Sequence, residues 1–151
     1  LLNAAAAYDV MQQACVVVDA GTAITVDLVD GAGTFHGGAI APGAQMMLDA
    51  LSQRTGLIPE TAFDAPVEKV GHNTIEAMRV GAFYGLRGIV RELLDQYAEV
   101  LGAYPAVVAT GGDGGLIFHE FELVDRFVPN LTLMGLAATL RVALEQDSGE
   151  D

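Results

Sequence analysis

The residues best suited to chemistry follow an apolar run, where Val16 to Val18 leads into Asp-Ala-Gly-Thr at positions 19–22. A strand that ends in small residues lets backbone N–H groups approach an anion closely, and Gly21 keeps that approach free of a side chain. Asp19 offers a carboxylate to a cation, and Thr22 offers a hydroxyl to a phosphate. The same residues would also suit an ordinary β-hairpin whose Asp and Thr satisfy the turn. On its own, this stretch is therefore compatible with a phosphate-facing turn or a plain hairpin.

Two other places combine polar groups with exposed backbone. Thr110-Gly111-Gly112 follows a short apolar strand, and the two glycines would let a ligand approach the main chain. Asn73 and Thr74 stand at the start of a long helical pattern, where free N–H groups and a hydroxyl suit a small anionic molecule. Each has a plain structural alternative, a turn in the first case and an N-cap in the second.

The composition limits the classes of partner. The chain has 151 residues, 52% of them hydrophobic, and its 20 acidic and 7 basic residues give a net charge of −13. Nucleic acids and anionic membranes are held by clusters of Lys and Arg, so neither is an expected partner. No apolar run reaches the roughly 18 residues of a membrane span.

The single Cys15 excludes an internal disulfide, and the three histidines lack zinc spacing. We expect a soluble, cytoplasmic chain.

The elements that must position these residues follow from the apolar patterns. We expect antiparallel strands at 15–19, 23–30 and 34–41, a helix at 44–54, an ordered loop at 55–70 and a long helix from 73 to about 100. A strand at 104–109, a short helix after residue 115, a strand at 124–128 and a helix at 131–146 complete the order. This order predicts an α/β fold in which helices pack on a mixed sheet of about five strands, three of them an antiparallel meander.

Three glycines interrupt the long helix, at Gly81, Gly85 and Gly88. Glycine weakens a helix, so three glycines spaced by four and three residues predict that another backbone, most simply a helix, packs closely against that face.

The order of elements resembles one lobe of the actin-like, ribonuclease-H-like kinases. Four segments match in order and spacing the second half of type III pantothenate kinases: Asp19 to Thr25 (DAGTAIT), Gly37 to Gly43 (GGAIAPG), Gly71 to Thr74 (GHNT) and Thr110 to Gly112 (TGG). The resemblance implies phosphorylation of pantothenate by ATP to 4′-phosphopantothenate, the first step of coenzyme A biosynthesis.

The resemblance also implies roles for individual residues. Asp19 would bind a monovalent cation, K⁺ or NH₄⁺, and Thr22 with Gly21 would contact the phosphates of ATP. Gly111 and Gly112 would pass close to the adenosine, and Thr74 would contact pantothenate. A homodimer is implied as well, and the glycine-bearing helix is a candidate surface for it.

Two family elements do not occur in the sequence. These are an Asp-x-Gly-Asn-Thr phosphate loop, which helps to hold the nucleotide and Mg²⁺, and a Gly-x-Asp-Arg element that carries the catalytic base. The resemblance therefore predicts that residues 1–146 form the C-terminal lobe of such a kinase, that the base lies upstream of Leu1, that 147–151 form a disordered tail and that the isolated chain is inactive. Two alternatives remain at this stage: a non-catalytic regulator of the Bvg accessory factor type, and another actin-like small-molecule kinase.

Overall fold

The computed structural model describes residues 1–147, and its centre is a sheet with the strand order β3-β2-β1-β4-β5. The strands are β1 (Cys15–Ala20), β2 (Ala23–Val29), β3 (Phe35–Pro42), β4 (Ala106–Thr110) and β5 (Arg126–Phe127). The pairs β1–β2 and β2–β3 are antiparallel, whereas β1–β4 and β4–β5 are parallel. The expected mixed sheet with an antiparallel meander is confirmed.

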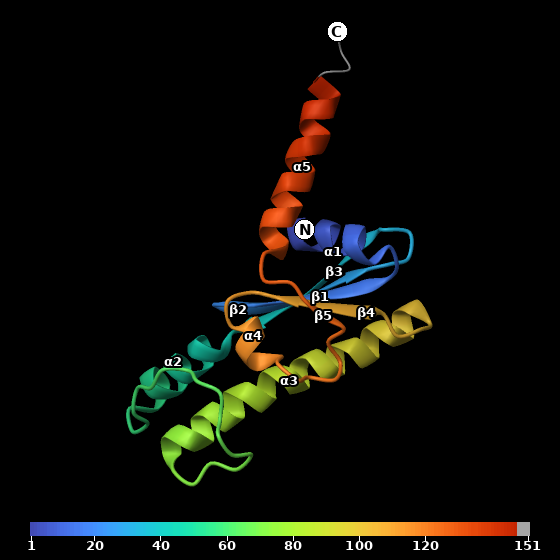
Figure 1. Cartoon of the computed structure of the whole chain (residues 1–151). Helices are drawn as coiled ribbons and strands as arrows, with labels where there is room; N and C mark the ends of the chain where they lie inside the picture. Colours follow the sequence, from blue (N-terminus) through green and yellow to red (C-terminus); the bar gives the residue numbers. More distant parts are fainter. Residues whose placement is uncertain (148–151) are drawn as a thin grey trace.

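Helices cover both faces of this sheet (Figure 1). On one face lie α1 (Leu2–Met11) and the base of α5 (Leu131–Asp147), which projects beyond the sheet. On the other face lie α3 (Thr74–Leu101) and the short α4 (Gly114–Ile117), and α2 (Ala44–Thr55) packs against α3. The molecule is thus a three-layer α/β/α arrangement.

The alternation of side chains along β1 explains why both faces are covered. Val16 and Val18 point into a core shared with Leu86 and Val90 of α3. Cys15 and Val17 point the other way, into a second core with the alanines of α1, because successive residues of a strand face opposite sides. Burial raises the pKa of the Cys15 thiol to about 11, so this cysteine is a packing residue and not a reactive one.

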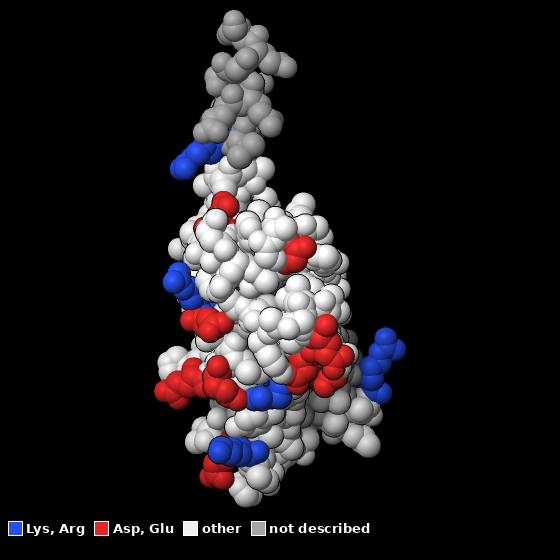
Figure 2. Space-filling view, turned by 90° about the vertical axis from the view of Figure 1, so that its right-hand side faces the viewer, with Lys and Arg blue, Asp and Glu red and all other residues white. Residues whose placement is uncertain are grey.

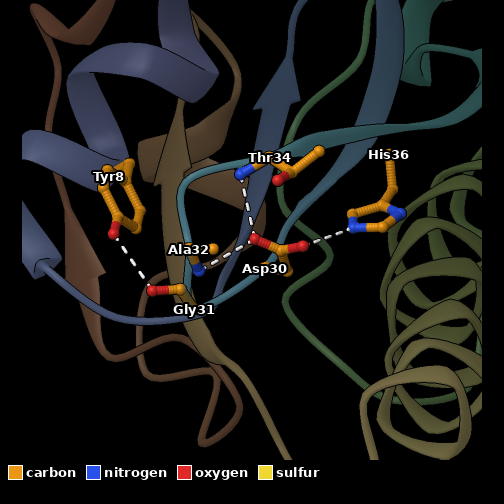
Figure 3. Close-up of polar contacts among 6 residues, drawn as sticks. All are labelled: Tyr8, Asp30, Gly31, Ala32, Thr34 and His36. Carbon is orange, nitrogen blue, oxygen red and sulfur yellow. Dashed lines mark hydrogen bonds and ion pairs between the residues drawn. The ribbon is translucent and has the colours of Figure 1, made fainter.

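The turn between β2 and β3 is held by Asp30 (Figure 3). Its carboxylate accepts hydrogen bonds from the backbone N–H groups of Ala32 and Thr34, both at 2.9 Å, and pairs with His36 Nε2 at 2.7 Å. The Tyr8 hydroxyl donates to the Gly31 carbonyl at 3.1 Å and ties α1 to the same turn. These contacts fix the end of α1 over the meander.

Three details differ from the expectation. Residues 124–128 were expected to form a strand, but the strand β5 spans only Arg126–Phe127, although the N–H groups of Asp125 and Val128 also donate to carbonyls of β4. The prediction of a backbone packed on the glycine face of α3 is wrong for the chain itself, because no other part of the described residues comes within 4 Å of a Cβ built at Gly81, Gly85 or Gly88. The expected tail, 147–151, lies outside the described residues except for Asp147, which ends α5.

Acidic side chains outnumber basic ones on the face shown in Figure 2, where they form groups over the lower half of the molecule. This agrees with the net charge of −13. Within residues 1–147, no helix has both the length and the apolar character that crossing a membrane would require.

Candidate functional site

The two glycine-containing strand ends lie side by side. Because β1 and β4 are parallel neighbours with Asp19 opposite Thr110, the residues that follow both strands emerge at the same edge of the sheet. The Asp113 N–H donates to the Ala20 carbonyl at 3.0 Å and joins the two connections directly. Two segments that are far apart in the sequence therefore form one surface.

Asp19 stands at the centre of this edge. Its side chain is half-buried, and its Oδ2 atom accepts a hydrogen bond of 2.7 Å from Nδ2 of Asn3 in α1. Its Oδ1 atom lies against Gly111, since a Cβ built on that glycine would stand 2.5 Å away. The carboxylate is thus clamped between α1 and the loop after β4.

Gly111 and Gly112 have different surroundings. Gly111 has a φ of +95°, and a Cβ there would collide with the Ala20 carbonyl oxygen, so the close approach of β1 already requires glycine. Gly112 is exposed, and no other part of the described chain lies within 4 Å of a Cβ built on it. Of the two, Gly112 is the position where a ligand has open access to the backbone.

Gly21 and Thr22 form the turn between β1 and β2, at the same edge. The Gly43 N–H donates to the Thr22 carbonyl at 3.0 Å, and Gly43 is the N-cap residue of α2. No side chain among the described residues caps this helix, so its first N–H groups are free beside the turn. A helix N-terminus attracts anions, and the Thr22 side chain is exposed next to it.

Thr74 is the first residue of α3 and stands apart from this cluster. Asn73 caps the helix by accepting from the Glu76 N–H at 3.0 Å, which leaves the Thr74 hydroxyl outside the cap. Thr74 lines a hollow of about 510 Å³. That hollow shares Leu51, Ala77 and Met78 with an apolar groove of about 600 Å³ between α2 and α3, and the groove reaches Pro42, next to Gly43. The two hollows are therefore neighbours, and together their lining extends from Pro42 to Thr74.

The loop between α2 and α3 borders the hollow and is held in place by two side chains. Gln45 donates to the Thr61 carbonyl at 3.1 Å and accepts from the Phe63 N–H at 2.8 Å. Arg79 donates to the Ala62 carbonyl at 3.1 Å. These bonds attach residues 61–63 to α2 and α3, and the order of the whole connection stays a prediction.

Sequence reasoning missed two polar residues near Asp19. No motif in the sequence marks Asn3, because only the packing of α1 on the sheet brings it to Asp19. Asp27 could have been found from the hairpin register, because Thr25 pairs with Asp19 and Asp27 lies two residues further on the same face. Burial raises the pKa of Asp27, the positive N-terminal amine opposes that shift, and the negative charge of Asp19 adds to it.

The donor atoms beside Asp19 suit a hard cation. The Asp19 carboxylate and the Oδ1 atom of Asn3 are oxygen donors of the kind that could hold such an ion, and the Asn3 oxygen is buried without a hydrogen-bond partner in the described part of the chain. Among the same residues, no group of three or more His, Cys, Asp or Glu side chains could hold a metal ion.

Solved structures share this fold. The activator of 2-hydroxyisocaproyl-CoA dehydratase from Clostridium difficile, solved with bound ADPNP, aligns with 99% of this chain and 68% of its own at a TM-score of 0.57 and 13% identity. A Campylobacter jejuni protein described under the Baf family of transcriptional activators aligns with 95% of this chain and 65% of its own, at a TM-score of 0.64 and 22% identity. The fold is that of the actin-like ATPases.

Sequence comparison gives the family. Residues 1–96 match the family model of type III pantothenate kinase. The Akkermansia muciniphila enzyme of that name is 46% identical over 136 residues, which are 90% of this chain and 56% of the relative. The chain belongs to the type III pantothenate kinase family, and it spans about half the length of the curated relatives it matches.

Proposed function

We propose that residues 1–146 are the C-terminal lobe of an enzyme that transfers the γ-phosphoryl group of ATP to pantothenate, giving 4′-phosphopantothenate for coenzyme A biosynthesis. The observation that carries this proposal is the meeting of Asp19, Thr22 and Gly111 at one edge of the sheet in a member of the type III pantothenate kinase family. Ligands of open α/β sheets bind at such edges, beyond the carboxyl ends of the strands.

In this proposal the nucleotide lies along the two strand connections. Thr22 and Gly21 give a hydroxyl and backbone N–H groups to the phosphates, beside the uncapped start of α2. Gly112 has open surroundings, so the adenosine can pass close to the main chain there. Gly111 contributes by allowing the loop after β4 to fit tightly against β1. Asp19 holds a monovalent cation, K⁺ or NH₄⁺, which lowers the local negative charge when it is bound.

Pantothenate is placed along the two neighbouring hollows that lead to Thr74. Its carboxylate suits the Thr74 hydroxyl and the N-terminus of α3, and its dimethyl-bearing carbon chain suits the apolar groove between α2 and α3. The reacting hydroxyl would then point toward the Pro42 end of these hollows, on the side of the Thr22 turn.

Phosphoryl transfer depends on charge neutralisation and on a base for the attacking hydroxyl. We assign no catalytic residue within the chain, and we expect the base Asp and most Mg²⁺ ligands in a second lobe that precedes Leu1. We also propose that the enzyme is cytoplasmic and works as a homodimer.

The experiment compares the 151-residue chain with the protein encoded by the same gene including its upstream sequence. Both are given ATP, Mg²⁺ and KCl, and 4′-phosphopantothenate is measured by mass spectrometry. We expect product from the longer protein, none from the chain alone, and a loss of at least about 100-fold in the longer protein when Asp19 is replaced by Ala. Turnover by the isolated chain would contradict the need for a second lobe.

The same assay separates the alternatives from the sequence. An upstream sequence without the Asp-x-Gly-Asn-Thr and Gly-x-Asp-Arg elements, together with no turnover, would favour a regulator of the Bvg accessory factor type. Phosphorylation of acetate or a sugar in place of pantothenate would favour another actin-like kinase.

A further inference from the structure

A side-chain contact links the first turn of α1 to the candidate cation residue. Asn3 donates from Nδ2 to Oδ2 of Asp19 at 2.7 Å, across the layer between α1 and the end of β1. Ala4 and Ala7, on the same turn and the next, are buried against the sheet and fix the position of α1. The packing of α1 on the sheet therefore fixes where the Asn3 side-chain amide lies.

The other end of this amide lacks a partner. Asn3 Oδ1 is buried and accepts no hydrogen bond from any described residue, and it is the one buried side-chain atom of the described residues in that condition. Leaving a buried acceptor unsatisfied destabilises the fold, so such an atom calls for an explanation, such as a bound ion or water. Turning the amide over would not help, because Oδ1 would then face the Asp19 carboxylate.

The electrostatic surroundings favour a positive partner for this atom. Asp19 and Asp27 lie on the sheet face that α1 covers, and the charge of Asp19 contributes to the raised pKa of Asp27. The charged groups acting on Asp27 are Asp19 and the N-terminal amine. A buried acceptor on a side chain that pairs with the Asp19 carboxylate is better matched by a cation than by another acceptor.

We propose that Asn3 is a positioning residue for Asp19 and supplies its Oδ1 atom as a further oxygen ligand to the monovalent cation at that site. The inference rests on the cation role of Asp19 in the proposed function. In this arrangement the Nδ2 contact occupies one carboxylate oxygen of Asp19, and the amide and carboxylate together present their remaining oxygens to one ion. Asn oxygens are common ligands of hard cations, and residues that orient a ligand typically change ion affinity about 10- to 100-fold.

Thermal unfolding tests this without any activity measurement. The chain is unfolded in KCl, NaCl and tetramethylammonium chloride at equal ionic strength, and the melting temperature is followed as KCl replaces the tetramethylammonium salt. A cation that binds only the folded state raises the melting temperature with its concentration. We expect a K⁺-dependent rise for the unaltered chain, and for Asn3→Leu a half-saturating K⁺ concentration at least about tenfold higher. Leu has nearly the same shape as Asn, so Asn3→Leu preserves the packing of α1.

Asn73→Ala is the matched control. It also removes an Asn side chain that makes a hydrogen bond, but this bond lies within the start of α3, between Asn73 and Glu76. We expect a lower melting temperature in every salt and an unchanged K⁺ response. Asn3→Asp, which restores an oxygen at the site, should recover part of the K⁺ response above pH 5.

The outcomes separate this inference from the proposed function. If Asp19→Asn abolishes the K⁺ response while Asn3→Leu leaves it intact, the role of Asn3 is wrong and the cation role of Asp19 stands. If the melting temperature of the unaltered chain is the same in K⁺ and in tetramethylammonium, the roles of Asn3 and of Asp19 at a cation are both wrong. The pantothenate assay then still tests the kinase function independently.

Discussion

At the scale of single residues, Gly111 combines a positive φ with close contact to β1. An alanine there must adopt a φ of +95° and place its Cβ 2.5 Å from Asp19 Oδ1. We expect Gly111→Ala to lower the free energy of unfolding by about 2–4 kcal/mol, from the left-handed backbone and the overlap together. Urea denaturation measures it. Gly112→Ala is the control and should change the free energy by less than about 0.5 kcal/mol, since no other part of the described chain is near.

Asp30 makes the stability of the β2–β3 turn depend on pH. The hydrogen bond from His36, followed by that from the Thr34 N–H, lowers the pKa of Asp30 from 3.8 to about 2. A carboxyl group with a lower pKa in the folded state stabilises that state above its unfolded pKa, and this contribution disappears as the pH falls from about 4 to 2. Asp30→Asn should therefore be less stable than the unaltered chain at pH 5, with the difference shrinking toward pH 2. Urea midpoints across this range measure it, and a difference independent of pH would contradict the assignment.

The sequence allowed some of these residues to be predicted and not others. Asp19 and Gly111 stand out because each follows an apolar strand directly. Asn3 does not, since its contact with Asp19 exists only after α1 packs on the sheet. The partner of His36 was equally hidden, because it depends on the conformation of the turn that begins at Asp30. Local patterns indicate residue types at strand ends, whereas contacts between layers depend on tertiary packing.

At the scale of elements, the start of α3 is defined by reciprocal hydrogen bonds. Asn73 Oδ1 accepts from the Glu76 N–H at 3.0 Å, and Glu76 Oε2 accepts from the His72 N–H at 2.8 Å. We expect Asn73→Ala to cost about 1 kcal/mol in the free energy of unfolding and Asn73→Ser much less, because serine also caps helices. Urea denaturation of both variants measures this. Equal losses in the two variants would mean that the lost stability does not come from the helix cap.

Elements with strong apolar patterns were predictable, and weakly patterned ones were not. The three strands of the meander and the long α3 follow their periodicity to within a few residues. The last strand was overestimated, because Val124 is apolar but lies outside the strand, and Val128 contributes a single hydrogen bond to Ala109 of β4 without extending the strand. A parallel edge strand is specified by its pairing with β4 and not by its own sequence.

At the scale of the whole molecule, the glycine face of α3 is open. Gly81, Gly85 and Gly88 are exposed, and no other part of the described chain comes within 4 Å of a Cβ at any of them. Each glycine in a helix costs about 1 kcal/mol relative to alanine, so within one chain these residues only reduce stability. Close packing of a second α3 across this face would be a physical reason to retain them, and it is the arrangement we expect in the proposed homodimer.

Replacing all three glycines by alanine should therefore have opposite effects on folding and on assembly. We expect the free energy of unfolding of the monomer to rise by about 2–3 kcal/mol and the dimer dissociation constant to rise at least about tenfold, since added methyl groups separate two closely packed helices. Urea denaturation at low concentration measures the first quantity, and sedimentation equilibrium measures the second. Glu99→Ala, an exposed change near the other end of α3, should leave assembly unchanged. Unchanged assembly in the triple variant would place the dimer contact elsewhere, and a strictly monomeric unaltered chain would contradict the homodimer for these 151 residues.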